Sequence, residues 1–406
     1  MKIFLLLTLF ISPLLQAKVW HSQSAWTQES SKEFSNWIAS DEYNVNLFQV
    51  GSKWENIKTD CADAIIAAQV IFAFERRIQF SLQLSEGSAH SITSDSHKFD
   101  QIQDDVQRVK SFIHYLGESI GTEGLARYNS YPIDLREIRP GDFYISRWKT
   151  NGNFIRHAAM IKEVLPTGHL VLYSSTTPVK VRELEVREGM PLHVLSGKPW
   201  GFKRIRPAAM SVHELEDYSL NQYDLLNQVG EDSFFPRVID HLKVEEDSLE
   251  ENLKRRVRNL CSQLKLRNRE INSTQIYLES IGHRCMNYSE YDEHSTPSRD
   301  KSLLNGIKRL LYGWKKIRRS NSATELSHEL TSALDSILRK NDSDEARLEL
   351  RKMCHIRLNL NGENLLYDLK NFFDLSMKGQ ISSHPNDTVA KRWGAPGQNT
   401  SCKSFY

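Results

Sequence analysis

The sequence predicts an α+β fold in the first half of the chain and a mainly helical domain after it. Two helical segments come first: 60–75 is apolar on nearly all sides after an N-cap, and 99–116 has apolar residues at helical spacing. Short runs of β-branched and aromatic residues follow at 143–146, 155–164 and 169–174, separated by turn residues. Helices that precede a group of neighbouring strands are typical of α+β proteins, in which helices cover an antiparallel sheet.

Length and composition limit the class of protein. The chain has 406 residues, of which 39% are hydrophobic and 26% are charged. These values are ordinary for a packed protein of two or three domains, and they exclude a wholly disordered, collagen-like or polytopic membrane chain. Lys and Arg total 53 and Asp and Glu total 51, which gives a net charge of +2. A chain so close to neutral lacks the positive charge that is typical of nucleic-acid-binding proteins.

The N-terminus predicts a signal peptide at residues 1–17. Lys2 supplies the positive start, residues 3–15 are apolar, and Ala17 ends a small-residue cleavage site before Lys18. The apolar stretch is shorter than a membrane span requires, so a retained anchor is the less favoured interpretation. We therefore expect an exported protein, periplasmic or extracellular, with no stable membrane span after cleavage.

Three regions are expected after the signal peptide: an α+β domain at 18–207, a helical domain at 208–380 and an irregular tail at 381–406. The first region opens with a polar, partly helical lead-in, and 85–97 is predicted as a loop. Two further strands are predicted at 179–186 and 200–205.

In the helical domain, apolar residues keep helical spacing at 260–266, 326–338 and 365–373. Ser322 and Glu325 form a capping-box pattern, which predicts the start of the second of these helices.

The five cysteines divide into one and four. Cys61 stands alone, and the others lie in the C-terminal region: Cys261, Cys285, Cys354 and Cys402. An exported protein can form disulfides, and four cysteines can pair in three ways, between which the sequence does not choose. The simplest expectation is two bridges in the C-terminal region with Cys61 free.

Cys61 has the sequence context of a nucleophile. Asp60 is a good N-cap, so Cys61 would be the first residue of a buried helix, where partial positive charge favours thiolate and free N–H groups can stabilise an oxyanion. His157 lies in a strand after a polar loop and is the candidate base. Tyr173 and Ser174 end the next strand and are the candidates to orient its imidazole. The alternative is that Cys61 is a small buried hydrophobe.

Three motifs, taken in order, resemble a known family. Thr59-Asp60-Cys61-Ala62-Asp63-Ala64-Ile65-Ile66 is similar to the D-C-S-G-hydrophobic motif that opens the catalytic helix of NlpC/P60 and CHAP peptidases. Residues 139–143 (R-P-G-D-F) resemble the strand entry that precedes the family's histidine. Residues 157–161 (H-A-A-M-I) resemble its H-V-A/G-hydrophobic strand, with a hairpin following.

This resemblance covers about residues 55–180. It implies a papain-like fold and hydrolysis of amide bonds in peptidoglycan peptides, with Cys61 as nucleophile and His157 as base. The expected partner is peptidoglycan or another cell-envelope polymer. No zinc motif or phosphate loop is present in the sequence, so we expect no metal and no cofactor.

Two departures from the family keep other functions open. Ala62-Asp63 stands where the family usually has Ser-Gly, and Ser174 or Tyr173 stands where it often has His, Asn, Gln or Glu. The alternatives are a non-catalytic envelope-binding or assembly protein with the same fold, and an acyltransferase on a related scaffold.

Two basic clusters lie in the helical domain, at 254–258 and 308–319. The favoured interpretation is solvated helix faces balanced by nearby acids. The alternative is a patch that contacts anionic envelope polymers.

Overall fold

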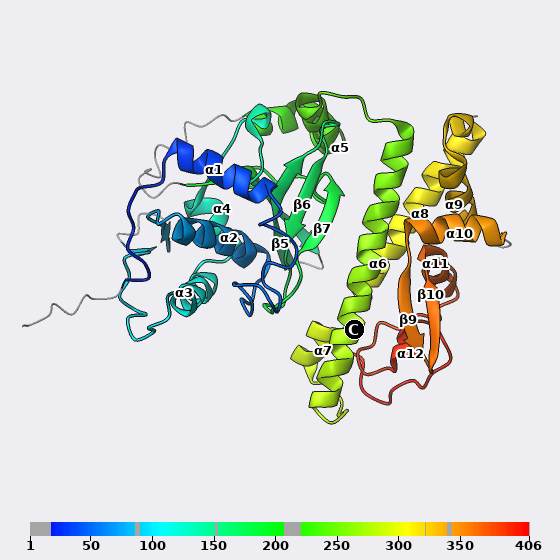
Figure 1. Ribbon diagram of the computed structural model, residues 1–406. Helices are drawn as coiled ribbons and strands as arrows, with labels where there is room; N and C mark the ends of the chain where they lie inside the picture. Colours follow the sequence, from blue (N-terminus) through cyan, green and yellow to red (C-terminus); the bar gives the residue numbers. More distant parts are fainter. Residues whose placement is uncertain are drawn as a thin grey trace, which may run out of the picture. The chain divides into compact units, whose positions relative to one another are not determined.

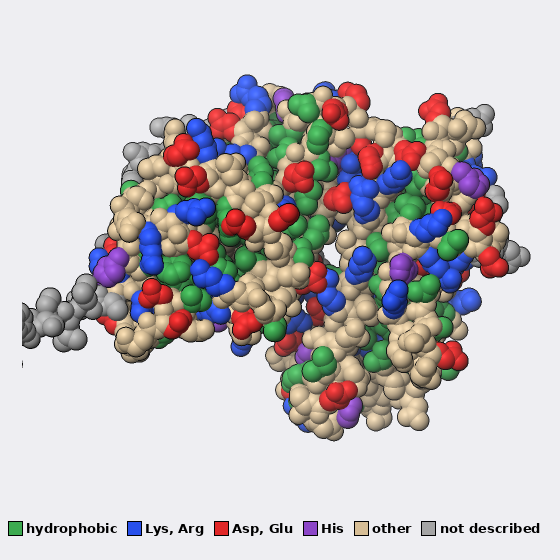
Figure 2. Space-filling model, viewed as in Figure 1, with side chains coloured by type: hydrophobic (Ala, Val, Ile, Leu, Met, Phe, Trp, Pro, Cys, Tyr) green, Lys and Arg blue, Asp and Glu red, His purple; other side chains and the backbone are tan. Residues whose placement is uncertain are grey.

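The computed structural model describes residues 18–85, 90–150, 153–206, 221–320, 322–338 and 343–405 (Figure 1). The expected signal peptide at 1–17 lies outside the described residues. The structure is 48% helical and 16% strand, a mixture of helix and sheet that is consistent with the α+β class. No helix among the described residues is long and apolar enough to cross a bilayer. Lys and Arg side chains are interspersed with Asp and Glu over the face in Figure 2, in keeping with the near-zero net charge.

The chain divides into two compact units. Of the residues that the structure describes, those within 1–160, 179–183 and 195–224 form the N-terminal unit, and those within 161–178, 184–194 and 225–406 form the C-terminal unit. The helices of the N-terminal unit are α1 (Gln28–Ala39), α2 (Cys61–Glu75), α3 (Asp105–Ser119) and α4 (Thr122–Tyr128).

Helix α2 is the centre of the N-terminal unit. Every residue from Cys61 to Phe74 is buried, as an apolar run on all sides of a helix requires. Aromatic rings close around it, and Trp20 contacts both Phe74 and Phe112 edge to face. Because the helix is enclosed on all sides, the position of its first residue, Cys61, below the protein surface is fixed by the surrounding core.

A six-stranded sheet has the strand order β3-β8-β4-β5-β6-β7. Its strands are β3 (Ser130–Pro132), β4 (Phe143–Thr150), β5 (Asn153–Val164), β6 (Leu170–Ser174), β7 (Glu185–Gly189) and β8 (Gly201–Ile205). The strands predicted at 143–146, 155–164, 169–174 and 200–205 are therefore confirmed. In the register of β4 with β5, Ser146 is opposite His157.

Two sequence predictions for this half need correction. The strand expected at 179–186 begins only at Glu185, because Lys180 instead forms an isolated backbone bridge with Thr59, just before α2. The loop expected at 85–97 contains β2 (Ser91–Thr93), which pairs with β1 (Ser81–Gln83) and buries one apolar side chain, that of Ile92.

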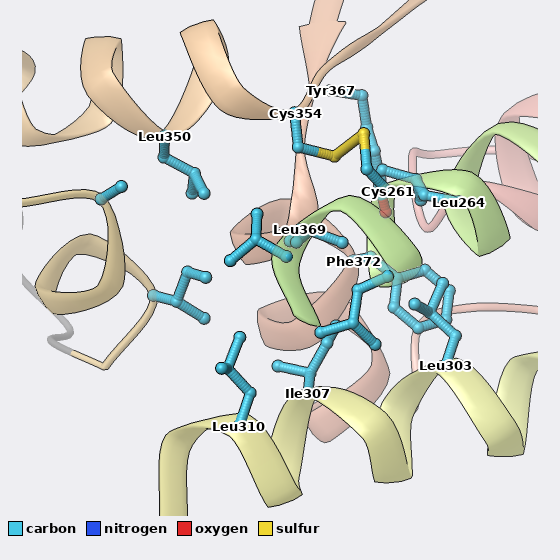
Figure 3. Close-up of a cluster of buried hydrophobic side chains, with 14 of the residues drawn as sticks. Cys261, Leu264, Leu303, Ile307, Leu310, Leu350, Cys354, Tyr367, Leu369 and Phe372 are labelled. Carbon is cyan, nitrogen blue, oxygen red and sulfur yellow. A yellow bond between two sulfur atoms is a disulfide. The ribbon is translucent and has the colours of Figure 1, made fainter. Parts of the chain in front are cut away.

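The C-terminal unit is mainly helical. Its elements are most of α5 (Asn221–Leu242), α6 (Leu249–Ser280), α7 (Tyr288–His294), α8 (Pro297–Arg319), α9 (His328–Leu338), α10 (Asp344–Met353), β9 (Ile356–Leu360), β10 (Glu363–Tyr367), α11 (Leu369–Met377) and α12 (Val389–Arg392). Side chains from several of these helices form one apolar cluster, in which Leu303, Ile307 and Leu310 come from α8 (Figure 3).

The disulfides pair Cys261 with Cys354 and Cys285 with Cys402, and Cys61 is free, as expected. The first bridge lies against the apolar cluster (Figure 3). Two disulfides are compatible with an oxidising compartment.

The helix predicted at 365–373 is in part a strand. Asn361 and Gly362 both have positive φ, which is the geometry of a tight Asn-Gly hairpin turn, and β10 occupies 363–367. The helix begins only at Leu369, where Asp368 caps it. The capping-box prediction at Ser322 is also wrong: residues 322–325 form a 3₁₀ turn, and α9 begins at His328.

Candidate functional site

The start of α2 is held by a reciprocal cap. Asp60 Oδ1 accepts hydrogen bonds from the N–H groups of Ala62 (3.0 Å) and Asp63 (3.1 Å), which confirms the predicted N-cap. In return, Asp63 Oδ2 accepts a hydrogen bond from the N–H of Asp60, with an N–O distance of 3.0 Å. Asp63, the residue that departs from the family motif, therefore closes the capping box.

Helix α3 approaches this cap closely. A Cβ atom built on Gly117 would lie 2.6 Å from Asp63 Oδ1, so only a glycine allows the α3 backbone to pack here. Burial, and then the negative charge of Asp60, raises the pKa of Asp63 to about 6. The cap therefore contains a carboxyl group that titrates near neutral pH.

The Cys61 sulfur lies against two other elements of the N-terminal unit. The side chain is buried, with 4% of the residue exposed. Sγ is 3.5 Å from Thr122 Oγ1 in α4, and hydrogen bonding by the backbone at Ala158 and Ala62 acts to lower its pKa. Ala158 directly follows His157 in β5. The structure thus brings Cys61 to the strand segment that carries His157.

The protonation state of Cys61 differs from the sequence prediction. Burial, followed by the charge of Asp60, raises the pKa of the thiol to about 11, and the hydrogen bonds from Thr122, Ala158 and Ala62 act in the opposite direction without reversing this. The expectation of a resting thiolate is therefore wrong, because desolvation outweighs the partial positive charge of the helix terminus. At neutral pH the group is a thiol.

Fewer backbone N–H groups are available to stabilise an oxyanion than the sequence predicts. The N–H groups of Ala62 and Asp63 already donate to Asp60. The N–H of Cys61 makes no hydrogen bond to any residue that the structure describes. It is the donor at the start of α2 that remains for an incoming carbonyl oxygen.

The other predicted site residues lie on strands. His157 is half-buried in β5, and Ser146 is its partner in β4. Tyr173 and Ser174 are half-buried at the end of β6 and belong to the C-terminal unit, where their register partners are Val186 and Glu185. The roles of base and orienting group stay predictions.

Two neighbours of the site were missed by sequence reasoning. Thr122 begins α4, and its local sequence indicates a helix start but not contact with a residue 61 positions away. His114 in α3 accepts the N–H of Lys58 at its Nε2 (3.2 Å), which holds the segment leading to Cys61. Burial and the charge of Lys58 lower the pKa of His114, which favours the neutral ring that can accept this bond.

The P-G-D turn has a structural role in this chain. Asp142 is 1% exposed. Its carboxylate accepts hydrogen bonds from Nε (2.6 Å) and Nη2 (2.9 Å) of Arg204 in β8. It also accepts the N–H of Arg139 at 3.0 Å. Gly141 has a φ of 90°, and a Cβ there would lie 2.8 Å from the ring of Phe34. The turn thus fixes the entry of β4, and therefore the register that positions β5.

Within the described ranges, no three His, Cys, Asp or Glu side chains are grouped so that they could hold a metal ion. No protein-family model, no curated protein and no solved structure matches this chain. The case for a function rests on the residues around Cys61 themselves.

Proposed function

We propose that the protein is an exported cysteine hydrolase on a papain-like scaffold, and that it cleaves amide bonds in peptidoglycan peptides. The observation that carries this proposal is that Cys61, the first residue of a buried helix, is hydrogen-bonded by the backbone at Ala158, the residue that follows His157 in β5. The order of the Cys, P-G-D and His motifs supports the same proposal.

The raised pKa of Cys61 defines how such a reaction begins. The imidazole of His157 accepts the Sγ proton while the sulfur attacks the amide carbonyl carbon, so that no free thiolate accumulates. The Cys61 N–H donates to the developing oxyanion. The C–N bond then breaks, the imidazolium returns its proton to the amine, and water hydrolyses the thioester with His157 again as base.

A second candidate is a non-catalytic envelope-binding protein that retains the same fold. The 4% exposure of Cys61 and its thiol form at neutral pH favour it, because an inert buried cysteine has these properties.

Digestion of purified peptidoglycan separates the two candidates. Wild-type protein, Cys61→Ala and His157→Ala are incubated with the polymer, and newly formed amino groups are identified by mass spectrometry of the soluble peptides. If the protein is the proposed hydrolase, wild type should release products, and the rate should fall at least about a hundredfold in both variants. Lys265→Ala, an exposed change on α6, serves as the control for handling and folding.

Equal product yields from wild type and Cys61→Ala would end the nucleophile assignment. Sedimentation with the insoluble polymer but no product from any variant would favour the binding protein. Products carrying an added amine, instead of a free carboxylate, would identify an acyltransferase.

A further inference from the structure

Helix α8 carries an unusual excess of positive charge. Its 23 residues include eight Lys or Arg and one acid, Asp300. Two of the eight are paired, Arg299 with Glu270 (3.2 Å) and Arg318 with Asp335 (2.6 Å). The other six are exposed and make no ion pair with the described part of the chain: Lys301, Lys308, Arg309, Lys315, Lys316 and Arg319.

The basic cluster on α6 is different. Lys254 pairs with Glu250 at 2.7 Å, Arg255 pairs with Asp247, and Arg258 pairs with Glu188 at 2.8 Å. Apart from Arg256, this cluster is balanced by acids, as the sequence interpretation expects. On α8 the six side chains are solvent-exposed, as that interpretation expects, but among the described residues no acids balance them.

The unpaired residues of α8 form a line. Lys301, Lys308, Lys315 and Arg319, with Tyr312 between them, recur at helical spacing and so fall on one face of the helix. At 1.5 Å per residue the line is about 27 Å long. Tyr312 is 63% exposed, and Lys316 Nζ is 4.7 Å from the centroid of its ring. We call these five residues, with Arg309 and Lys316 beside them, the α8 stripe.

Other elements of the C-terminal unit add cations to one side of the stripe. The charge of Arg309 acts on Arg187 in β7 and, after burial, is the second cause that lowers the pKa of Arg187. Arg256 of α6 reaches α8 at Gly313, where its Nη1 is 3.9 Å from the position of an added Cβ. Like charges brought together in this way repel, and a bound anion would offset the repulsion.

We propose that the α8 stripe binds an acidic glycan, a linear polysaccharide whose carboxylates recur along the chain. A row of cations fits a linear polyanion, and an exposed tyrosine is a platform for the face of a sugar ring. This inference does not depend on the chemistry of Cys61.

The surroundings of α8 disfavour two other polyanions. A helix that enters the major groove of DNA must protrude, whereas α8 is packed along its length by α6, α9 and α11. A helix that lies in a membrane interface inserts its apolar face, whereas the apolar residues of α8, such as Leu303, Ile307 and Trp314, are buried in the core of the unit.

The test compares two variants of the full chain with equal change in charge. Lys308→Glu with Lys315→Glu reverses two charges of the stripe. Lys265→Glu with Lys378→Glu reverses two exposed charges that also lack ion pairs among the described residues but lie on α6 and after α11. Binding to fluorescently labelled polygalacturonate is measured by anisotropy at several salt concentrations, with neutral dextran as the negative probe.

We expect the stripe variant to lose at least about tenfold in affinity, with a smaller salt dependence, and the control variant to stay within about twofold of wild type. Equal losses from both variants would overturn the proposal, because they would indicate net charge alone. Failure of wild type to bind polygalacturonate would overturn it as well. So would tighter binding to duplex DNA or to phosphatidylglycerol vesicles than to the glycan.

Discussion

Asp60 and Cys61 are neighbours in the chain with opposed roles at one helix terminus. The Asp60 carboxylate caps α2 and so fixes the position of the cysteine, yet its charge is the second cause, after burial, that raises the pKa of the Cys61 thiol. The residue that builds the site thus also keeps its sulfur protonated. Through Asp60, the position of Cys61 and the pKa of its thiol are therefore coupled.

Asp60→Asn should separate the two roles. Asparagine is an equally good N-cap, so the free energy of unfolding should change by less than about 1 kcal/mol. Removing the negative charge should lower the pKa of Cys61, which shifts the midpoint of alkylation by iodoacetamide to lower pH. An unchanged midpoint would mean that burial alone sets the pKa, and Asp41→Asn, an exposed change, provides the control.

Asp63 should make stability fall as the pH rises. Its pKa is raised to about 6 in the folded protein, so between its ordinary value and 6 the folded state binds more protons than the unfolded state. The stabilisation is present in acid and is lost as the pH rises through 6. Urea unfolding at pH 4.5 and pH 7 should therefore show wild type losing stability relative to Asp63→Asn. A constant difference between the two proteins would contradict this.

Asp142→Asn should be strongly destabilising. It removes one partner of a buried pair and leaves the Arg204 guanidinium without its carboxylate, which costs about 3 kcal/mol or more in comparable cases. The matched control is Asp134→Asn, whose partner Arg136 has a side chain that is 70% exposed, so the loss of stability there should be much smaller. Similar losses from the two variants, measured by urea unfolding, would show that the P-G-D turn is not held by this pair.

The two disulfides should differ in what their removal costs. They close loops of similar length, 93 and 117 residues, so their effects on the unfolded chain are comparable. Cys261 and Cys354 are also part of the apolar cluster, so replacing both by alanine should leave a void there. We expect that pair to lose more stability than Cys285→Ala with Cys402→Ala. The reverse order in denaturant unfolding would contradict the packing argument.

Local sequence patterns predict those parts of the fold that are determined by interactions between residues close together in the chain. Asp60 followed by an apolar run predicts both the cap and the buried helix, since the deciding atoms lie within a few residues. Leu365 and Leu366 also fit helical spacing, so the sequence predicts a helix over 365–367, where the structure has the end of β10. The Asn361-Gly362 turn decides the structure here, because both residues adopt positive φ and join β9 to β10 in a tight hairpin.

The chemistry of the site could not be predicted in the same way. The pKa of Cys61 depends on its depth and on groups as distant in sequence as Thr122 and Ala158, and no local pattern contains that information. The charge of α8 gives a second example. Its composition resembles that of the cluster on α6, and only the folded chain shows that acids reach one cluster and leave the other exposed.

Because the two disulfide loops overlap, they determine whether the chain stays in one piece after a protease cleaves its backbone. A single cut at any point from residue 262 to residue 401 is spanned by at least one of the two bridges. Nicked protein would therefore migrate as one species until a reductant is added. An enzyme or binding protein working outside the cell would keep its C-terminal half attached after a cleavage that severs the backbone.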